Sequence, residues 1–219
     1  MPLGDKFVSR FAGEFKYVVM SSGASPHPLP SSDKNFSQIG SYVSPSAPLM
    51  LSLKMPEGER IGLNNASSIF LSSSVANKLF GNDNAIGKVV KVDNKVSAVV
   101  TGVYQDLPYN SSFKDNSFFA TWNLYLSYDE SVRSSQNDWG NDSYYIYVQL
   151  ADAAEIRSVS AKIKNADIID NSDKKIANAR QGLFLFPMSR WHLFSDFQDG
   201  KSVGSRIVYV WLFGVIGLF

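Results

Sequence analysis

The chain contains no cysteine among its 219 residues. Disulfide bonds, thiol nucleophiles and cysteine-based zinc sites are therefore excluded from its chemistry. Histidine occurs only twice, at His27 and His192, and the two are far apart, so no short-spaced zinc-binding pair exists. A domain of this size can fold in an oxidising compartment without disulfides, so the compartment stays open.

The chain also lacks a strong net charge. It carries 21 Lys and Arg against 20 Asp and Glu, which gives +1 at pH 7. A balanced surface does not attract a polyanion, so we expect no nucleic-acid partner. Hydrophobic residues make up 44% of the chain, which is ordinary for a globular protein with a sizeable core.

Common catalytic and cofactor motifs are missing as well. Neither a Gly-x-Ser-x-Gly elbow nor a phosphate-binding P-loop occurs. Asp138 and Asp142 flank Trp139, as in a sugar-binding loop, although a solvated loop is the simpler interpretation. We therefore predict no catalytic residues, no cofactor-binding residues and no metal ligands.

The last residues form an uncharged run, IVYVWLFGVIGLF, at positions 207–219. A membrane-spanning helix needs about 20 apolar residues, and this run is shorter. It is nevertheless apolar on every helical face, and Tyr209 and Trp211 near its start are typical of a membrane interface. We predict a truncated membrane helix, with a buried core helix as the alternative. Residues 1–6 lack the features of a signal peptide.

Local patterns predict the elements of the first half. We expect a helix at 5–13 and strands at 15–21, 36–43 and 69–71. Residues 22–34 are predicted as a loop with an exposed His27, because three alternating prolines remove backbone donors. After the strand at 69–71, Ser72 or Ser73 caps a helix that Gly81 ends. Strands at 87–92 and 96–103 form a hairpin through Asp93-Asn94.

Fewer helices and strands are predicted in the second half of the chain. Phe118-Phe119 is expected in the sheet core, residues 127–143 as a long polar loop and 144–150 as a strand. Asp152 and Glu155 have the spacing of a capping box for a following helix, and 183–186 is predicted as a strand. This strand–helix–strand order suggests a split βαβ unit within an α+β fold.

Three segments together resemble the MacB-type periplasmic core domain of FtsX-like ABC-transporter permeases. Residues 69–90, IFLSSSVANKLFGNDNAIGKVV, resemble the family's strand, capped helix, KLFG stop and P-IGK hairpin entry, with Ala85 in place of proline. Residues 99–113, VVTGVYQDLPYNSSF, resemble its VTGV-x-DLP-NS segment. Residues 187–195, PMSRWHLFS, are similar to its PL-x-x-IHL-S segment, with Trp191 in place of isoleucine. Their order and spacing also fit.

The resemblance implies a two-lobed extracytoplasmic domain. Residues 1–34 and 136–200 would form a porter-like lobe with βαβ units, and 35–135 an inserted mixed α/β lobe. Residues 206–219 would start the second transmembrane helix, with the domain on the periplasmic side of a bacterial inner membrane. The implied partners are a cytoplasmic ABC ATPase domain or subunit, a second permease copy, and an envelope partner or a peptide, lipoprotein or drug cargo. The domain would transmit ATPase-driven motion without catalysis.

Two other functions remain open from the residues alone. A soluble extracytoplasmic glycan- or peptide-binding module would bury 207–219 in its core and line a cleft with Trp139. A hydrolase would bring dispersed residues such as Asp106, Asp138 or His192 into one pocket.

Overall fold

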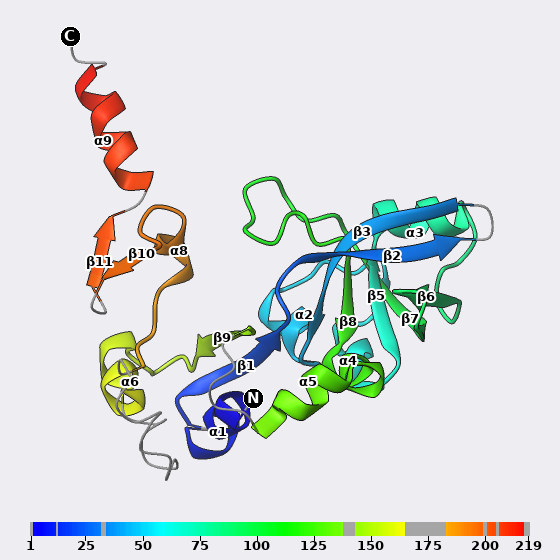
Figure 1. Cartoon of the computed structure of the whole chain (residues 1–219), viewed down its shortest axis with the longest axis horizontal. Helices are drawn as coiled ribbons and strands as arrows, with labels where there is room; N and C mark the ends of the chain where they lie inside the picture. The colour runs from blue at the N-terminus through cyan, green and yellow to red at the C-terminus, as the bar shows by residue number, and fades with distance from the viewer. Residues whose placement is uncertain are drawn as a thin grey trace. The chain divides into compact units, whose positions relative to one another are not determined.

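The computed structural model describes residues 2–11, 13–31, 34–137, 143–164, 183–198, 201–204 and 206–216. The chain divides into two compact units, Met1–Asp152 and Ala153–Phe219. Figure 1 shows the elements of both units, and each unit is described by itself below.

The first unit is built on a mixed sheet, which has nine strands within the described residues. Its order is β4 (Glu57–Gly58), β7 (Val96–Tyr104), β5 (Ser68–Ser72), β8 (Phe118–Thr121), β3 (Lys34–Val43), β1 (Phe15–Ser21) and β9 (Tyr145–Leu150), with β2 (Ser25–Ser31) beside β3 and β6 (Val89–Val92) beside β7. The β5–β7 and β3–β8 pairs are parallel and the others antiparallel. The expected mixture of hairpins and helices is thus present as a mixed α/β domain.

The centre of this sheet is buried on both faces. Alternate residues of a strand point to opposite faces, and β5 follows this rule: Ile69 and Leu71 belong to one apolar cluster and Phe70 to the other. Helices α3 (Ser73–Phe80) and α4 (Trp122–Tyr128) contribute side chains to the first cluster. Helix α2 (Ala47–Met50) and the 3-10 turn η1 (Arg60–Asn64) contribute to the second. Burial on both faces explains the continuous apolar runs 69–71 in β5 and 118–120 in β8.

Strand β2 corrects the loop predicted for residues 22–34. It pairs with β3 from Ser25↔Gly40 to Ser31↔Lys34. The three prolines occupy alternate positions, so the groups that lack an N–H donor all point away from β3. On that outer side the Pro28 carbonyl accepts from the backbone N–H of Asp93 at 3.0 Å. The prolines therefore suit an outer strand, and His27 between them is mostly buried rather than exposed.

The predicted unit at 69–103 is confirmed. The hydroxyl of Ser72 accepts from the Val75 N–H at the start of α3, and Gly81 ends the helix at φ +63°. Strands β6 and β7 then form the expected hairpin. Asp93 and Asn94 have φ of +56° and +55°, the left-handed conformation that a two-residue hairpin turn requires.

Three further short helical elements complete the first unit. Helix α1 (Pro2–Arg10) precedes β1, close to the helix expected at 5–13. Helix α5 (Glu130–Ser134) and the turn η2 (Ser135–Asn137) occupy part of the loop predicted at 127–143, which was wrong there. The carboxylate of Asp129 accepts from the N–H groups of Ser131 and Val132 and so starts α5.

The second unit contains α6 (Ile156–Ile163), α8 (Met188–Trp191), the hairpin β10 (Asp196–Gln198) and β11 (Lys201–Gly204), and α9 (Arg206–Ile216). The capping box predicted with Asp152 as the cap is wrong, because the N-cap residue of α6 is Glu155 and its side chain makes no capping hydrogen bond. The strand predicted at 183–186 is also wrong. Its backbone bonds to the α6 region instead, with Leu183 N–H donating to the Lys164 carbonyl and Leu185 N–H to the Ser160 hydroxyl.

Candidate functional site

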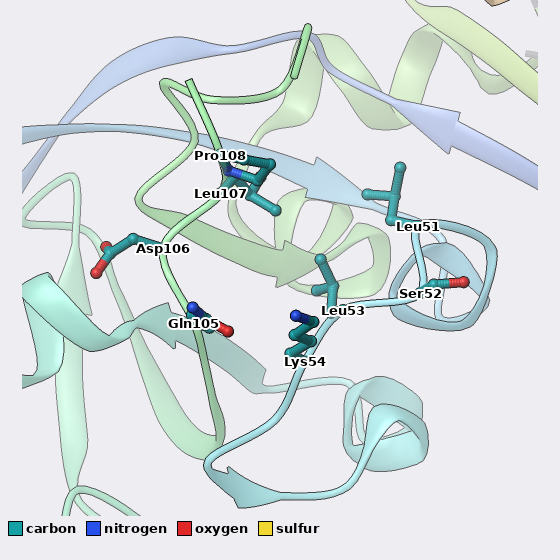
Figure 2. Close-up of a pocket in the computed structure, with 8 residues that line it drawn as sticks. All are labelled: Leu51, Ser52, Leu53, Lys54, Gln105, Asp106, Leu107 and Pro108. Carbon is teal, nitrogen blue, oxygen red and sulfur yellow. The ribbon is translucent and has the colours of Figure 1, made fainter. Parts of the chain in front are cut away.

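A groove of about 390 Å³ lies between two short backbone segments of the first unit. One wall is the segment 51–54 that follows α2, and the other is the segment 105–108 that follows β7 (Figure 2). Leu51, Leu107 and Pro108 supply apolar surface, while Lys54 and Gln105 supply polar groups. This size and this mixture are typical of sites that accept a small ligand or a short peptide segment.

The walls of the groove are held by one backbone hydrogen bond and by the Arg60 side chain. Gln105 N–H donates to the Lys54 carbonyl at 2.8 Å, which joins the walls at one point. The Arg60 guanidinium donates to the carbonyls of Leu53 and Ser52. The groove is therefore a preformed feature of the folded unit.

Asp106, which we considered as a hydrolase residue, lies at this groove but has a structural partner. Its carboxylate accepts from the Ser74 hydroxyl at 2.8 Å and from the Ser74 N–H at 3.4 Å. An acidic group at the first turn of α3 also interacts favourably with the helix dipole. Asp138 and Trp139 lie outside the described residues, and His192 is exposed in the second unit. Within the residues that the structure describes, no pocket therefore brings these three candidate residues together.

The loop from β7 to β8 is anchored at its two ends and exposed at its tip. The Tyr104 hydroxyl donates to the Asn116 carbonyl at 2.9 Å, and the Ser41 hydroxyl donates to the Asn116 side chain at 2.6 Å. Burial, and then the charge of Asp106, raise the pKa of Tyr104 well above its ordinary value. Tyr109 at the tip is 91% exposed. These hydrogen bonds hold the two ends of the loop together beside the sheet.

A second cluster of polar groups surrounds Asp93 in the hairpin turn. His27 Nδ1 lies 2.9 Å from both carboxylate oxygens, and because a carboxylate only accepts, Nδ1 carries the proton. In the neutral ring, Nε2 then accepts from the Ser25 hydroxyl at 2.8 Å. The Tyr128 hydroxyl donates to Asp93 at 2.9 Å. The Tyr42 hydroxyl lies 2.8 Å from the Tyr128 hydroxyl and 3.3 Å from Asp93, so its single proton is directed at these two acceptors. We call these five residues the Asp93 network.

The Asp93 network links elements that are distant in the sequence. It joins β2, β3, the β6–β7 turn and the end of α4. Burial is the main cause that raises the pKa of both Tyr42 and Tyr128 far above the ordinary tyrosine value, so both phenols stay protonated as donors. The order Ser–His–Asp occurs also in serine hydrolases, but here the aspartate is shared with two tyrosines and fastens a turn. The sequence does not predict this network, because its local pattern favours a loop over residues 22–34 where the structure has β2.

Metal chemistry finds no support in the described part of the chain. No group of three or more histidine, aspartate or glutamate side chains is arranged there to hold an ion.

Helix α9 exposes apolar side chains on several sides. The exposed fractions of Val208, Tyr209, Val210, Trp211 and Phe213 lie between 53% and 71%. Consecutive residues of a helix point in different directions, so no single stripe is buried. Among the described residues no helix has the length and hydrophobicity required to cross a bilayer.

Comparison with known proteins identifies the family. Residues 6–166 match the family described as the MacB-like periplasmic core domain, and the chain belongs to this family. It is therefore the periplasmic or extracellular domain of a MacB-like ABC transporter permease, a non-catalytic family that works with an ATPase partner. The predicted family is confirmed, and the matched residues include the segments 69–90 and 99–113, whereas 187–195 lies outside them.

Solved structures show the same fold at low identity. A domain attributed to a permease of Porphyromonas gingivalis has a TM-score of 0.62 and 19% identity, with 85% of this chain and 81% of that chain covered. The periplasmic region of MacB from Actinobacillus actinomycetemcomitans has a TM-score of 0.54 and 17% identity, covering 75% and 72%. The extracellular domain of the ABC-type transporter YknZ from Gram-positive bacteria has a TM-score of 0.52 and 18% identity, with 77% of this chain and 82% of that chain covered. No curated protein matches the chain.

Two of the sequence segments that suggested the family help to build the groove and its surroundings. The segment 99–113 supplies β7, one wall of the groove and the exposed Tyr109. The segment 69–90 supplies β5 and α3, whose first turn is held by Asp106. The groove itself was not predicted, because its other wall at 51–54 carries no recognisable pattern.

Proposed function

We propose that this domain is a non-catalytic lever that passes ATPase-driven motion to an envelope partner or to a peptide, lipoprotein or drug cargo. Membership of the permease family implies the ATPase in general terms. The transmission of motion, its receiver, a second permease copy and the location on the periplasmic side of a bacterial inner membrane are parts of the proposal.

The observation that carries the proposal is the contrast between helix α9 and the body it follows. Apolar side chains on several faces of α9 are left in water, a costly arrangement that insertion into lipid would relieve. The Ile207 N–H donates to the Leu193 carbonyl at 3.2 Å, so the start of α9 is fastened to the segment before it. We propose that residues 206–219 begin the second membrane helix and that this fastening couples helix movement to the domain.

The two-lobed division is also part of the proposal. Residues 1–34 and 136–200 would form the porter-like lobe, and 35–135 the inserted lobe. Pairing of β1 with β9 from Phe15↔Leu150 to Ser21↔Tyr145 supports the first grouping, because it joins the two distant pieces of the porter-like lobe.

A truncation tests the assignment of the last helix. A chain that ends at Ser205 should keep the melting temperature of the full chain within a few degrees and become more soluble, because α9 adds exposed apolar area. Thermal unfolding by circular dichroism and the soluble fraction after centrifugation measure both. A loss of several kcal/mol would instead mean that α9 belongs to a folded core, and the soluble binding module would then be the better interpretation.

The groove supports a second candidate function, the binding of a peptide segment from a partner or cargo. Its walls offer apolar side chains beside Lys54 and Gln105, a combination that can hold an apolar residue and the adjacent peptide groups. Titration of the domain with apolar tripeptides, followed by amide chemical shifts, should perturb residues 51–54 and 105–108 first. The Leu107→Asp variant should lose the effect, and an unchanged titration in that variant would rule out the groove.

A further inference from the structure

Three aromatic side chains of the second unit form a partly exposed cluster. Phe197 of β10 contacts Phe186 with ring centroids 4.9 Å apart and Phe184 with centroids 5.5 Å apart. Phe184 is 47% exposed and Phe197 is 41% exposed, although large aromatic side chains are usually buried. We call this cluster the aromatic patch. Its exposed area needs an apolar partner or remains a liability for aggregation.

The aromatic patch is tied closely to the start of α9. Phe197 pairs across the hairpin with Ser202, which precedes Arg206 by four residues, a path of at most about 13 Å in extended chain. The Leu193 carbonyl, between the patch segments, accepts from the first apolar residue of α9, Ile207. Figure 1 shows α8, β10 and β11 gathered at this end of α9.

We propose that the aromatic patch rests on the lipid surface beside the point where α9 enters the membrane. This inference relies on the proposed membrane insertion of α9. If α9 is in lipid, its first turn lies at the interfacial layer, and the hydrogen bond to Leu193 keeps the patch segments at that level. Aromatic rings favour this layer, because one part of it is apolar and another is hydrated.

The charges around the patch indicate contact through apolar area. Arg190 and Arg206 are exposed cations, and Asp196 is an exposed anion at the start of β10. Arg190 lies 4.8 Å from the ring centre of Phe194, so part of its charge faces an aromatic ring. These two cations and one anion leave a small net positive charge, which gives weak attraction to anionic lipid, and we expect lipid contact that persists at high salt.

The absence of cysteine allows a direct test, because any introduced cysteine is the only labelling site. The full chain is labelled with the fluorophore NBD at Ser189→Cys in α8, at Val210→Cys in α9, or at Lys78→Cys in α3. All three positions are exposed. NBD emission increases when the probe enters lipid. The probe partner is a vesicle of phosphatidylcholine with a minority of phosphatidylglycerol, at low and at high salt.

We expect emission at positions 210 and 189 to rise about twofold or more with vesicles, and emission at 78 to stay unchanged. Exchange of Phe184 and Phe197 for serine should remove roughly half of the rise at 189 and leave 210 unchanged. Exchange of both for leucine should preserve it, since the apolar area remains. The Tyr109→Ser variant, at an exposed aromatic residue of the first unit, is the matched control and should have no effect.

The outcomes separate the two proposals. A rise at 210 with no rise at 189 overturns lipid contact by the patch, leaves α9 as a membrane helix and points to a protein partner instead. No rise at either position overturns the membrane assignment of α9, and the inference falls with it. A rise at 189 that high salt abolishes, or that the serine exchange leaves intact, means attraction by charge rather than by the aromatic patch.

Discussion

Strand β5 and helix α9 are both apolar segments, yet the structure surrounds them differently. Ile69, Phe70 and Leu71 in β5 are fully buried, whereas Trp211 in α9 is 71% exposed. This difference in exposure does not follow from hydrophobicity, since both segments are rich in large aliphatic and aromatic residues. An apolar composition indicates that burial of the segment away from water is favourable. Only the surroundings of the segment show whether protein or lipid replaces the water.

The same contrast separates the two units. Among the described residues, the buried apolar side chains of the second unit are Val159 and Ile163, both in α6. The first unit contains the two apolar clusters on either face of the sheet. Dense packing would let the first unit move as one rigid body, which the proposed lever requires.

Shortening a buried side chain in the first unit should have the largest effect. Phe70→Ala empties space on one face of β5 and should lower the free energy of unfolding by about 3–5 kcal/mol. Trp211→Ala in α9 should change it by less than about 0.5 kcal/mol, since the ring is exposed. Urea unfolding followed by circular dichroism measures both. Comparable losses in the two variants would contradict the contrast between β5 and α9.

Removal of the charge in the Asp93 network should have an intermediate effect. Asp93→Asn keeps the size of the side chain and tolerates the positive φ, but it weakens the contacts with His27 and Tyr128. We expect the free energy of unfolding to fall by about 1–3 kcal/mol, because these partners are partly buried.

The matched control for this prediction is Asp83→Asn, which breaks an exposed ion pair with Lys88 of 2.8 Å. Exposed ion pairs contribute little to stability, so the free energy of unfolding should fall much less in Asp83→Asn than in Asp93→Asn. Equal changes at the two positions would mean that the Asp93 network does not fasten the turn.

The smallest effect appears only at high pH. Burial, and then the charge of Tyr145, raise the pKa of Tyr147 to about 12 in the folded protein. The folded state then holds this proton more tightly than the unfolded chain, so the stabilisation is complete below pH 10 and is lost as the pH rises toward 12.

A series of urea unfolding curves from pH 8 to pH 11.5 measures this loss. Tyr147→Phe should flatten the decline, whereas Tyr209→Phe in the exposed α9 should leave its slope unchanged. An identical slope in the Tyr147→Phe variant would show that this phenol does not contribute.

Local signals predicted the fold best where capping and turn residues coincide with an apolar pattern. Ser72, Gly81 and Asp93-Asn94 each act on the backbone within a few residues of themselves, so α3 and the β6–β7 hairpin appear where predicted. Prediction failed at β2, because proline alternation suits an outer strand only when a neighbour such as β3 bonds to its other side. It failed at 183–186 because the backbone there bonds to the α6 region instead.

The candidate sites depend on contacts between distant residues that the sequence does not reveal. The groove joins 51–54 with 105–108, and the Asp93 network joins β2 with a turn more than sixty residues later. Asp106 belonged to a recognised segment, yet its partner Ser74 could be found only in three dimensions. Polar residues in a sequence carry many possible partners, and folding selects among them.

Residue order alone was sufficient to predict the family, the absence of cysteine chemistry, the principal capped helix and hairpin, and the apolar character of residues 207–219. These properties depend on short stretches of chain or on composition, and neighbours change them little. The tertiary structure decided which face of each strand is buried, where the prolines of β2 fit, which groups surround Asp93, and where aromatic side chains stay exposed beside α9. Such features are set by packing between distant segments, and their free energies arise only when those segments meet.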